Sequence, residues 1–220
     1  MRTPTAVLFD MDGTLLDSRP GIVAATNATL RSLGRPEVAE ADLVSRIGPP
    51  LHDTWAELLQ RPVTDVADVV ADYRERYATL MLDGTRAYAG VERLLEGLAE
   101  RGLLLGVATS KAQPLAVALL EHLGLDGYFA AVRGPVPPSV EEKPATVARA
   151  LEALGLTTGT GAVIVGDRHH DITGGRAHGL ATIGAAWGYG SRAELEAAGA
   201  DAIASEPLGV APLLDGLTGS

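Results

Sequence analysis

Residues 5–18 read TAVLFDMDGTLLDS, and this segment carries the clearest signal of the fold class. Its first part, Thr5–Phe9, is a short apolar run with β-branched character, which is typical of a buried strand in a parallel sheet. A polar segment follows at once, so the strand is expected to end in a loop that presents Asp10 and Asp12. Asp-Gly is also a common turn dipeptide, and taken alone these acids fit an ordinary strand-to-helix turn equally well.

Strands and helices alternate after Gly90. The strands predicted after the first are Leu103–Ala108, Phe129–Val132, Ala162–Val165, Ala181–Gly184 and an edge strand, Asp201–Ala204. Helices are predicted at Pro20–Leu33, Val91–Arg101, Gln113–Leu123, Ala145–Leu154, Asp171–His178 and Arg192–Ala198, with a further helix at the C-terminus. This alternation predicts right-handed crossovers and an α/β fold, a doubly wound parallel sheet with helices on both faces.

A helical insertion interrupts this pattern. Between about residues 37 and 83 there is no strand candidate, and the amphipathic stretches Glu40–Ile47, Leu51–Leu59 and Thr64–Leu82 are separated by Gly- and Pro-containing breaks. We therefore expect an α/β core formed by residues 1–17 and 86–220, with an all-helical domain formed by residues 18–85.

Composition excludes several classes of protein. The 220 residues contain no cysteine, which excludes disulfides, thiolate metal sites and a cysteine nucleophile. The net charge of −10 makes a nucleic-acid partner unexpected, because such binding needs a basic face. No apolar run approaches the roughly 20 residues needed to span a bilayer, and no signal peptide is recognisable. We expect a cytoplasmic protein without a membrane partner, as a monomer or homodimer.

Polar residues follow several predicted strands at their carboxyl ends. Open parallel sheets hold their sites at this edge, so these side chains are expected to converge there. The set is Asp10, Asp12, Thr109, Ser110, Lys111, Asp167 and Asp171, joined by Lys143 at the start of a helix.

This combination of side chains suits hydrolysis of a phosphate monoester. Carboxylates gathered around one point raise one another's pKa, and a hard divalent cation such as Mg²⁺ relieves that repulsion. One carboxylate can then attack phosphorus, while another exchanges a proton with the leaving group and water. A lysine and a threonine hydroxyl can hold the transferring oxygens.

The same residues resemble a known family. The motifs that carry the resemblance are Phe9–Ser18, Thr109 at the end of a strand, Lys143-Pro144, and Gly166–Asp171 in the form G-D-x-x-x-D. In this order and spacing they resemble the motifs of the haloacid dehalogenase (HAD) superfamily of phosphohydrolases, over essentially the whole chain. The resemblance implies a Rossmann-like core with an inserted α-helical cap domain, of the C1 type.

The resemblance also implies roles for single residues. Asp10 would be the nucleophile and a Mg²⁺ ligand. Asp12 would be the general acid and base and would give its backbone carbonyl to the metal. Thr109 would bind the transferring phosphoryl group with help from the Ser110 backbone N–H, and Lys143 would pair with that group and with Asp10.

Further roles follow from the same resemblance. Asp167 would bind Mg²⁺ directly, and Asp171 would bind it through water or orient the site. Gly48, in the loop of the cap, would meet the substrate, and Lys111 would either join the phosphate site or remain a solvated charge at a helix start.

A finer resemblance concerns the substrate. The segments Ile47–Leu51, Ala108–Lys111, Gly166–Asp171 and Trp187–Gly190 together resemble phosphoglycolate phosphatase-like proteins, and most closely those described as 5′-nucleotidases. This implies that the partner is a small phosphorylated metabolite, a nucleoside monophosphate or phosphoglycolate.

Other functions stay open at this stage. A phosphomutase of the same fold carries an arginine where this chain has Leu51, and this difference counts against a phosphomutase. A hydrolase of carbon–chlorine bonds needs no acid at the position of Asp12, and a non-catalytic binding module would not need an intact set of acids. His169 and His170 are expected to be exposed loop histidines rather than metal ligands, because adjacent side chains rarely point the same way.

Overall fold

The computed structural model describes residues 4–159 and 161–217 and divides the chain into two compact units. One unit comprises residues 1–17 and 87–220, and the other comprises residues 18–86. The chain thus returns to the first unit one residue later than the expected boundary. Among the described helices, none is long and apolar enough to cross a membrane.

A six-stranded sheet forms the centre of the first unit. Its strands, in spatial order, are β5 (Ala131–Arg133), β4 (Leu104–Ala108), β1 (Ala6–Phe9), β6 (Ala162–Gly166), β7 (Ala181–Ala185) and β8 (Ala202–Ala204). All neighbouring strands in it are parallel. The strand that opens the sequence motif, β1, lies between β4 and β6, so the residues that follow these three strands share one edge.

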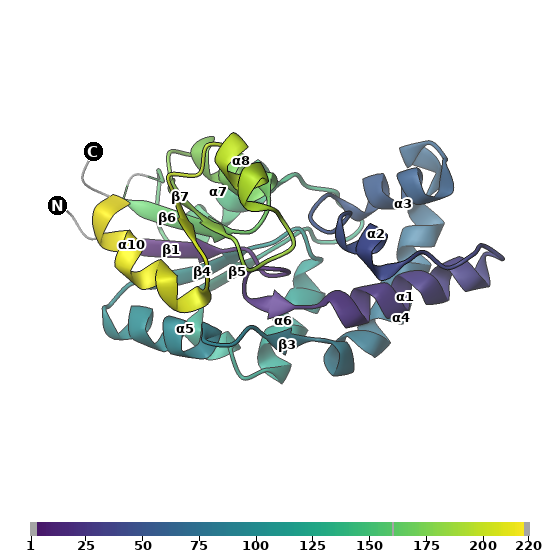
Figure 1. Ribbon diagram of the computed structural model, residues 1–220, viewed down its shortest axis with the longest axis horizontal. Coiled ribbons are helices and arrows are strands. Elements are labelled where there is room, and N and C mark those ends of the chain that lie inside the picture. Colours follow the sequence, from purple (N-terminus) through teal and green to yellow (C-terminus); the bar gives the residue numbers. More distant parts are fainter. Residues whose placement is uncertain (1–3, 160, 218–220) are drawn as a thin grey trace. The chain divides into compact units, whose positions relative to one another are not determined.

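Helices cover both faces of this sheet, with α7 and α8 on one face and α5 and α10 on the other (Figure 1). The helices of this unit are α5 (Val91–Glu100), α6 (Gln113–His122), α7 (Lys143–Ala153), α8 (His169–Arg176), α9 (Arg192–Ala197) and α10 (Val210–Leu217), with short 3₁₀ turns at Asp126–Tyr128 and Pro207–Gly209. Leu8 and Ile164 from neighbouring strands belong to one buried cluster with Val147 and Leu151 of α7. The predicted doubly wound α/β core is confirmed.

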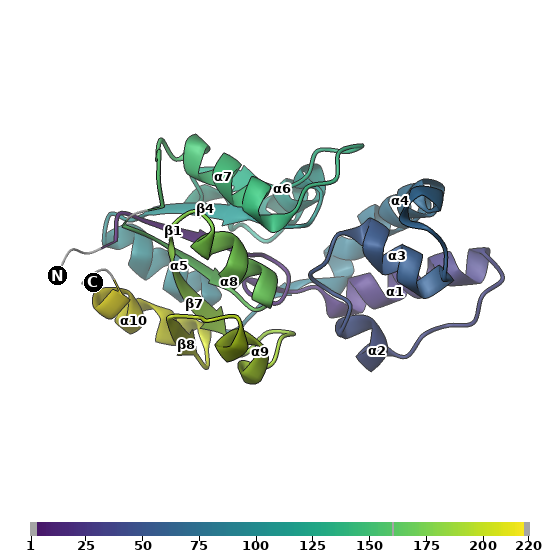
Figure 2. The same ribbon diagram turned by 90° about the horizontal axis from the view of Figure 1, so that it is seen from above.

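The second unit is built from helices: α1 (Arg19–Ser32), α2 (Glu40–Val44), α3 (Leu51–Leu59) and α4 (Ala67–Gly84), with a 3₁₀ turn at Val63–Asp65. Helices α1 and α4 lie antiparallel and side by side (Figure 2). A Cβ at Gly84 would collide with the backbone of Gly21, so glycine permits this close approach. Trp55 packs against Tyr73 with ring centroids 5.7 Å apart, which ties α3 to α4.

Helix α8 begins at His169, two residues before the predicted start. The backbone N–H of Arg168 donates to Asp171 Oδ2 over 3.0 Å, and the backbone N–H of Asp171 donates to the carbonyl of Arg168 over 3.0 Å. These two bonds extend the helix toward the strand. The prediction that His169 and His170 are loop residues is therefore wrong, because both belong to the first turn of α8 and are partly buried.

Other boundaries shift for local reasons. Helix α7 starts at Lys143 rather than Ala145, because proline fits the first turn and Pro144 is its second residue. Strand β5 starts later than predicted, since Asp126–Tyr128 forms a 3₁₀ turn that delays the chain's entry into the sheet. Two strands of two residues each, β2 (Leu16–Asp17) and β3 (Arg86–Ala87), pair with each other and were not predicted.

The first two residues of β4 generate a test of the core. Leu105 is 2% exposed and Leu104 is 43% exposed, although they are adjacent in one strand. Truncating a buried leucine to alanine costs about 2–5 kcal/mol, whereas surface changes stay within about 0.5 kcal/mol. We predict a loss of this size for Leu105→Ala in urea unfolding and little change for Leu104→Ala. Equal losses in the two variants would contradict the difference in burial between the two side chains.

Candidate active site

The acids that follow β1 and β6 lie together at the carboxyl edge of the sheet. The backbone N–H of Asp10 donates to Val165 O over 2.9 Å, which continues the ladder one residue beyond β1. Asp167 follows directly after the last residue of β6. Asp10, Asp167 and Asp171 each offer a carboxylate oxygen, and these oxygens all lie within 4.8 Å of one another. All three residues are buried.

Lys143 reaches this acid cluster from the start of α7. Its Nζ lies 2.6 Å from Asp10 Oδ1 and 2.6 Å from Asp171 Oδ1, and it donates to the carbonyl of Ala108 over 2.9 Å. The three donors of the ammonium group are thereby engaged. The side chain is only 4% exposed, so these contacts are made away from bulk water.

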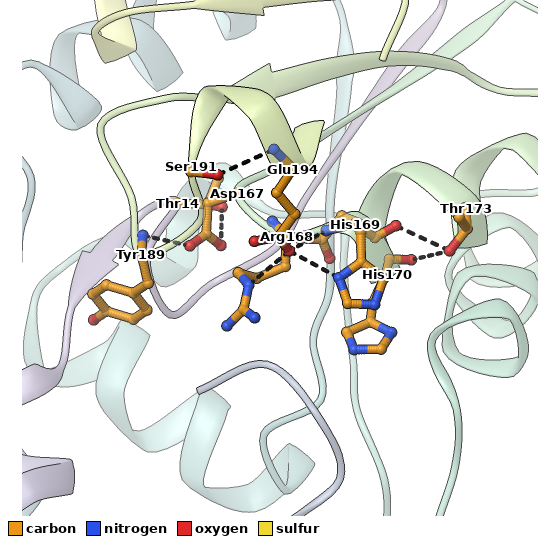
Figure 3. Close-up of polar contacts among 10 residues, drawn as sticks. Thr14, Asp167, Arg168, His169, His170, Thr173, Tyr189, Ser191 and Glu194 are labelled. Carbon is orange, nitrogen blue, oxygen red and sulfur yellow. Dashed lines mark hydrogen bonds and ion pairs between the residues drawn. The ribbon is translucent and has the colours of Figure 1, made fainter. Parts of the chain in front are cut away.

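Asp167 is held by neighbours from two other segments (Figure 3). Thr14 Oγ1 donates to its Oδ1 over 3.3 Å, and the backbone N–H of Tyr189 donates to its Oδ2 over 2.7 Å. Glycine is required beside it, because a Cβ at Gly13, where φ is +90°, would collide with the carboxylate. A Cβ at Gly188 would strike the Cβ of Asp167. These contacts fix the carboxylate in one orientation.

The electrostatics of the cluster leave an excess of negative charge. Burial raises the pKa of Asp10 to about 7; Lys143 opposes this effect and the neighbouring Asp171 adds to it. Burial, followed by the charges of Asp171 and Asp10, raises the pKa of Asp167 well above its ordinary value. Burial alone would lower the pKa of Lys143, but the two carboxylates that it contacts raise it. One ammonium group thus faces several carboxylates, and a buried, oxygen-only donor set of this kind fits a hard divalent cation.

Asp12 points to a different partner. Its Oδ2 lies 3.1 Å from Nζ of Lys111, and both side chains are largely buried. The Asp12 carboxylate is outside the acid cluster that could hold a metal ion. The contribution of its backbone carbonyl to a metal stays a prediction.

The segment after β4 supplies hydroxyl and backbone groups. Thr109 is buried, and its N–H donates to the carbonyl of Arg133 over 2.9 Å. Its Oγ1 accepts from the backbone N–H of Lys111 over 3.1 Å. Ser110 lies between them and is partly buried. Gly48 belongs to the helical unit, and its part in a substrate site stays a prediction.

The sequence did not indicate Glu194 of α9 as a site residue. It lies beside residues 167–171, which carry Asp167 and Asp171 and are called the acid-bearing loop below. Its Oε1 accepts from Arg168 Nε over 3.0 Å and from the backbone N–H of His169 over 3.0 Å. Burial would raise the pKa of Glu194, but the bonds from His169 and Arg168 outweigh it and lower this pKa to about 2. The sequence signal, Ser191 three residues before Glu194, indicates only a helix cap, which the structure also contains.

Comparison with protein families gives one match that spans most of the chain. Residues 7–185 match the model of haloacid dehalogenase-like hydrolases. A relative in Mycobacterium tuberculosis, the tyrosine-protein kinase PtkA, is 38% identical over 190 residues, which are 86% of this chain and 64% of PtkA. The chain therefore spans less than two thirds of the length of that relative.

Two further comparisons cover nearly complete proteins. The 5′-nucleotidase of Pseudomonas aeruginosa is 35% identical over 192 residues, which cover 87% of this chain and 86% of that protein. The crystal structure of a predicted phosphatase from Clostridium acetobutylicum superimposes with a TM-score of 0.89 at 30% identity, covering 98% of each chain.

Protons must leave this site when a metal ion enters, because metal binding requires ionised carboxylates. With the pKa of Asp10 raised to about 7 and that of Asp167 raised as well, protons compete with the metal below neutral pH. We predict that the apparent dissociation constant for Mg²⁺ falls as pH rises from about 6 to about 8, with release of protons on binding. Calorimetry in two buffers of different ionisation enthalpy measures both quantities. Binding that is independent of pH and buffer would contradict the raised pKa values.

Proposed function

Because the chain belongs to the haloacid dehalogenase-like hydrolase family, we propose that it is a phosphatase that hydrolyses a small phosphate monoester with Mg²⁺ as cofactor. The observation that carries the proposal is the buried ion pair at the sheet edge. Lys143 holds one oxygen of Asp10 at 2.6 Å inside a cluster of acids, which is the arrangement that a positioned carboxylate nucleophile requires.

Asp10, Asp167 and Asp171 are the residues that would hold the cation, since their oxygens already lie together. When bound, Mg²⁺ would neutralise these carboxylates and the oxygens of the phosphate group. The remaining chemistry belongs to the side chains of this protein.

In the first step that we propose, a carboxylate oxygen of Asp10 attacks phosphorus and the bond from phosphorus to the leaving oxygen breaks. Asp12 gives its proton to that leaving oxygen. The Thr109 hydroxyl accepts from the N–H of Lys111, so its own proton is available for a phosphoryl oxygen. Lys143 keeps Asp10 oriented throughout.

In the second step, a water molecule attacks the phosphorus of the aspartyl-phosphate. Asp12, now ionised, takes a proton from that water, and the bond from phosphorus to the oxygen of Asp10 breaks. Inorganic phosphate leaves, and both carboxyl groups return to their starting forms. One residue therefore serves as acid and then as base, as balance of protons requires.

The substrate that we propose is a nucleoside 5′-monophosphate or phosphoglycolate. The similarity to a bacterial 5′-nucleotidase over most of both chains supports a small phosphorylated metabolite. In this proposal the helical unit acts as a cap that selects the leaving group, with Gly48 in the loop between α2 and α3.

We predict that Asp10→Asn lowers the rate of phosphate release by more than about a thousandfold, because an amide cannot replace the attacking carboxylate. The assay measures inorganic phosphate from nucleoside monophosphates, phosphoglycolate, sugar phosphates and p-nitrophenyl phosphate, with Mg²⁺ or EDTA. Circular dichroism of the variant controls for folding.

Several results of this assay would count against the proposal. Near-wild-type turnover by a folded Asp10→Asn variant would exclude the nucleophile. An isomerised product without phosphate release would indicate a phosphomutase, and EDTA-resistant activity on a 2-haloacid would indicate a dehalogenase. Metal binding without turnover of any substrate would favour a binding module.

A separate prediction concerns Asp12, whose carboxylate pairs with Lys111 outside the acid cluster. We expect Asp12→Asn to lower kcat by about 10²–10⁴, the usual contribution of general acid–base catalysis, while Mg²⁺ affinity changes little. Calorimetric titration with Mg²⁺ beside the kinetic assay separates the two effects. A variant that loses Mg²⁺ binding in step with turnover would refute this division of roles.

A further inference from the structure

Glu194 holds the loop between the two acids that follow β6. Figure 3 shows Arg168 and His169 converging on its carboxylate. A single oxygen, Oε1, lies 3.0 Å from Arg168 Nε, 3.0 Å from the backbone nitrogen of His169 and 2.8 Å from His169 Nδ1. Glu194 thus contacts two consecutive residues of the segment that separates Asp167 from Asp171.

The contacts of Glu194 act directly on the backbone that orients Asp171. The N–H of Arg168 donates to Asp171 Oδ2 over 3.0 Å, while the side chain of the same arginine is held by Glu194. His169 starts α8, and its N–H, which has no partner inside the helix, also donates to Glu194. A shift of this carboxylate would therefore move the first turn of the helix that carries Asp171.

The turn before α9 contacts Asp167. Tyr189 donates its N–H to Asp167 Oδ2 over 2.7 Å, and a Cβ at Gly190 would collide with the backbone carbonyl of Asp167. Ser191 Oγ then accepts from the N–H of Glu194 over 3.1 Å, which fixes Glu194 at the start of α9. One short segment, residues 189–194, therefore contacts three consecutive residues, Asp167, Arg168 and His169.

Glu194 also neutralises the positive charge of Arg168. Arg168 directly follows Asp167 in the sequence, and its side chain is only 12% exposed. Without a counter-charge, its guanidinium group would repel a divalent ion nearby, since Coulomb interactions are strong where water is excluded. Glu194 supplies that counter-charge at 3.0 Å.

We propose that Glu194 is a positioning residue of the metal centre: it fixes the Arg168–His169 backbone and neutralises Arg168, so that Asp167 and Asp171 are held ready for a divalent cation. This proposal rests on the proposed function only for the presence of that metal centre. Substituting a residue that orients a metal ligand typically lowers metal affinity by about 10–100-fold.

The test compares Glu194→Gln with Glu196→Gln, a matched change on the same helix. Glu196 pairs with Arg192 at 3.4 Å, and both side chains of that pair are more than half exposed. The dissociation constant for Mn²⁺ is measured by electron paramagnetic resonance of the free ion, without substrate. Thermal unfolding of the metal-free proteins, and turnover across metal concentrations, complete the comparison.

We expect Glu194→Gln to raise the Mn²⁺ dissociation constant at least about tenfold, and Glu196→Gln to leave it within about twofold. Turnover of the first variant should recover when Mn²⁺ or Mg²⁺ is raised to saturation. Its metal-free melting temperature should fall by only a few degrees, because the amide oxygen still accepts from the His169 N–H. In an Arg168→Gln background the Glu194→Gln change should cost less, because the charge to be neutralised is gone.

Unchanged Mn²⁺ affinity in Glu194→Gln would overturn the proposal, as would equal weakening in both variants. A large fall in the metal-free melting temperature, with turnover lost even at saturating metal, would assign Glu194 to general stability and also overturn it. Wild-type protein that binds no Mn²⁺ would remove the metal centre of the proposed function itself, and with it the role of Glu194.

Discussion

The buried ammonium group of Lys143 lies 2.6 Å from Asp10 and 2.6 Å from Asp171, and the site depends on this arrangement. Ionised carboxylates away from water are costly unless they are paired and hydrogen-bonded. One lysine compensates only part of the charge of Asp10, Asp167 and Asp171, which explains why burial can raise the pKa of Asp10 to about 7. The fold thus assembles a site with an excess of negative charge, which the proposed divalent cation would offset.

The parallel sheet makes this arrangement possible. Because β1 lies between β4 and β6, the residues after these strands reach the same edge without long loops. Glycine at positions 13 and 188 lets the neighbouring backbone approach the carboxylate of Asp167, where a Cβ would collide. Asp167 is therefore positioned by the end of a strand, by the close approach of neighbouring backbone, and by hydrogen bonds from Thr14 and Tyr189.

The general fold was predictable because its signals are local. Short runs of four to six residues, most of them apolar, predicted the strands, and the motif order predicted the family, which the family model confirms over residues 7–185. The boundaries of α7 and α8 were less predictable, since they depend on Pro144 in the first turn and on the hydrogen bond from the Arg168 N–H to Asp171.

The contacts of the site were harder to foresee. The bond between Lys143 and Asp10 joins residues 133 positions apart, and the pairing of Lys111 with Asp12 depends on how two loops meet. Glu194 was missed for a different reason. The motif formed by Ser191 and Glu194 is fully explained as a helix cap, so nothing in the local pattern indicates that its carboxylate also contacts Arg168 and His169.

If Asp10 is the nucleophile, its carboxylate becomes phosphorylated during turnover, and the decisive experiment is to trap that aspartyl-phosphate. Enzyme mixed with substrate and Mg²⁺ is quenched in acid within the first turnover, digested, and analysed by mass spectrometry. We expect a phosphate group on the peptide that contains Asp10, located at Asp10 by fragmentation. Turnover that proceeds with phosphate attached to another residue, or with no phosphorylated peptide at any quench time, would contradict it.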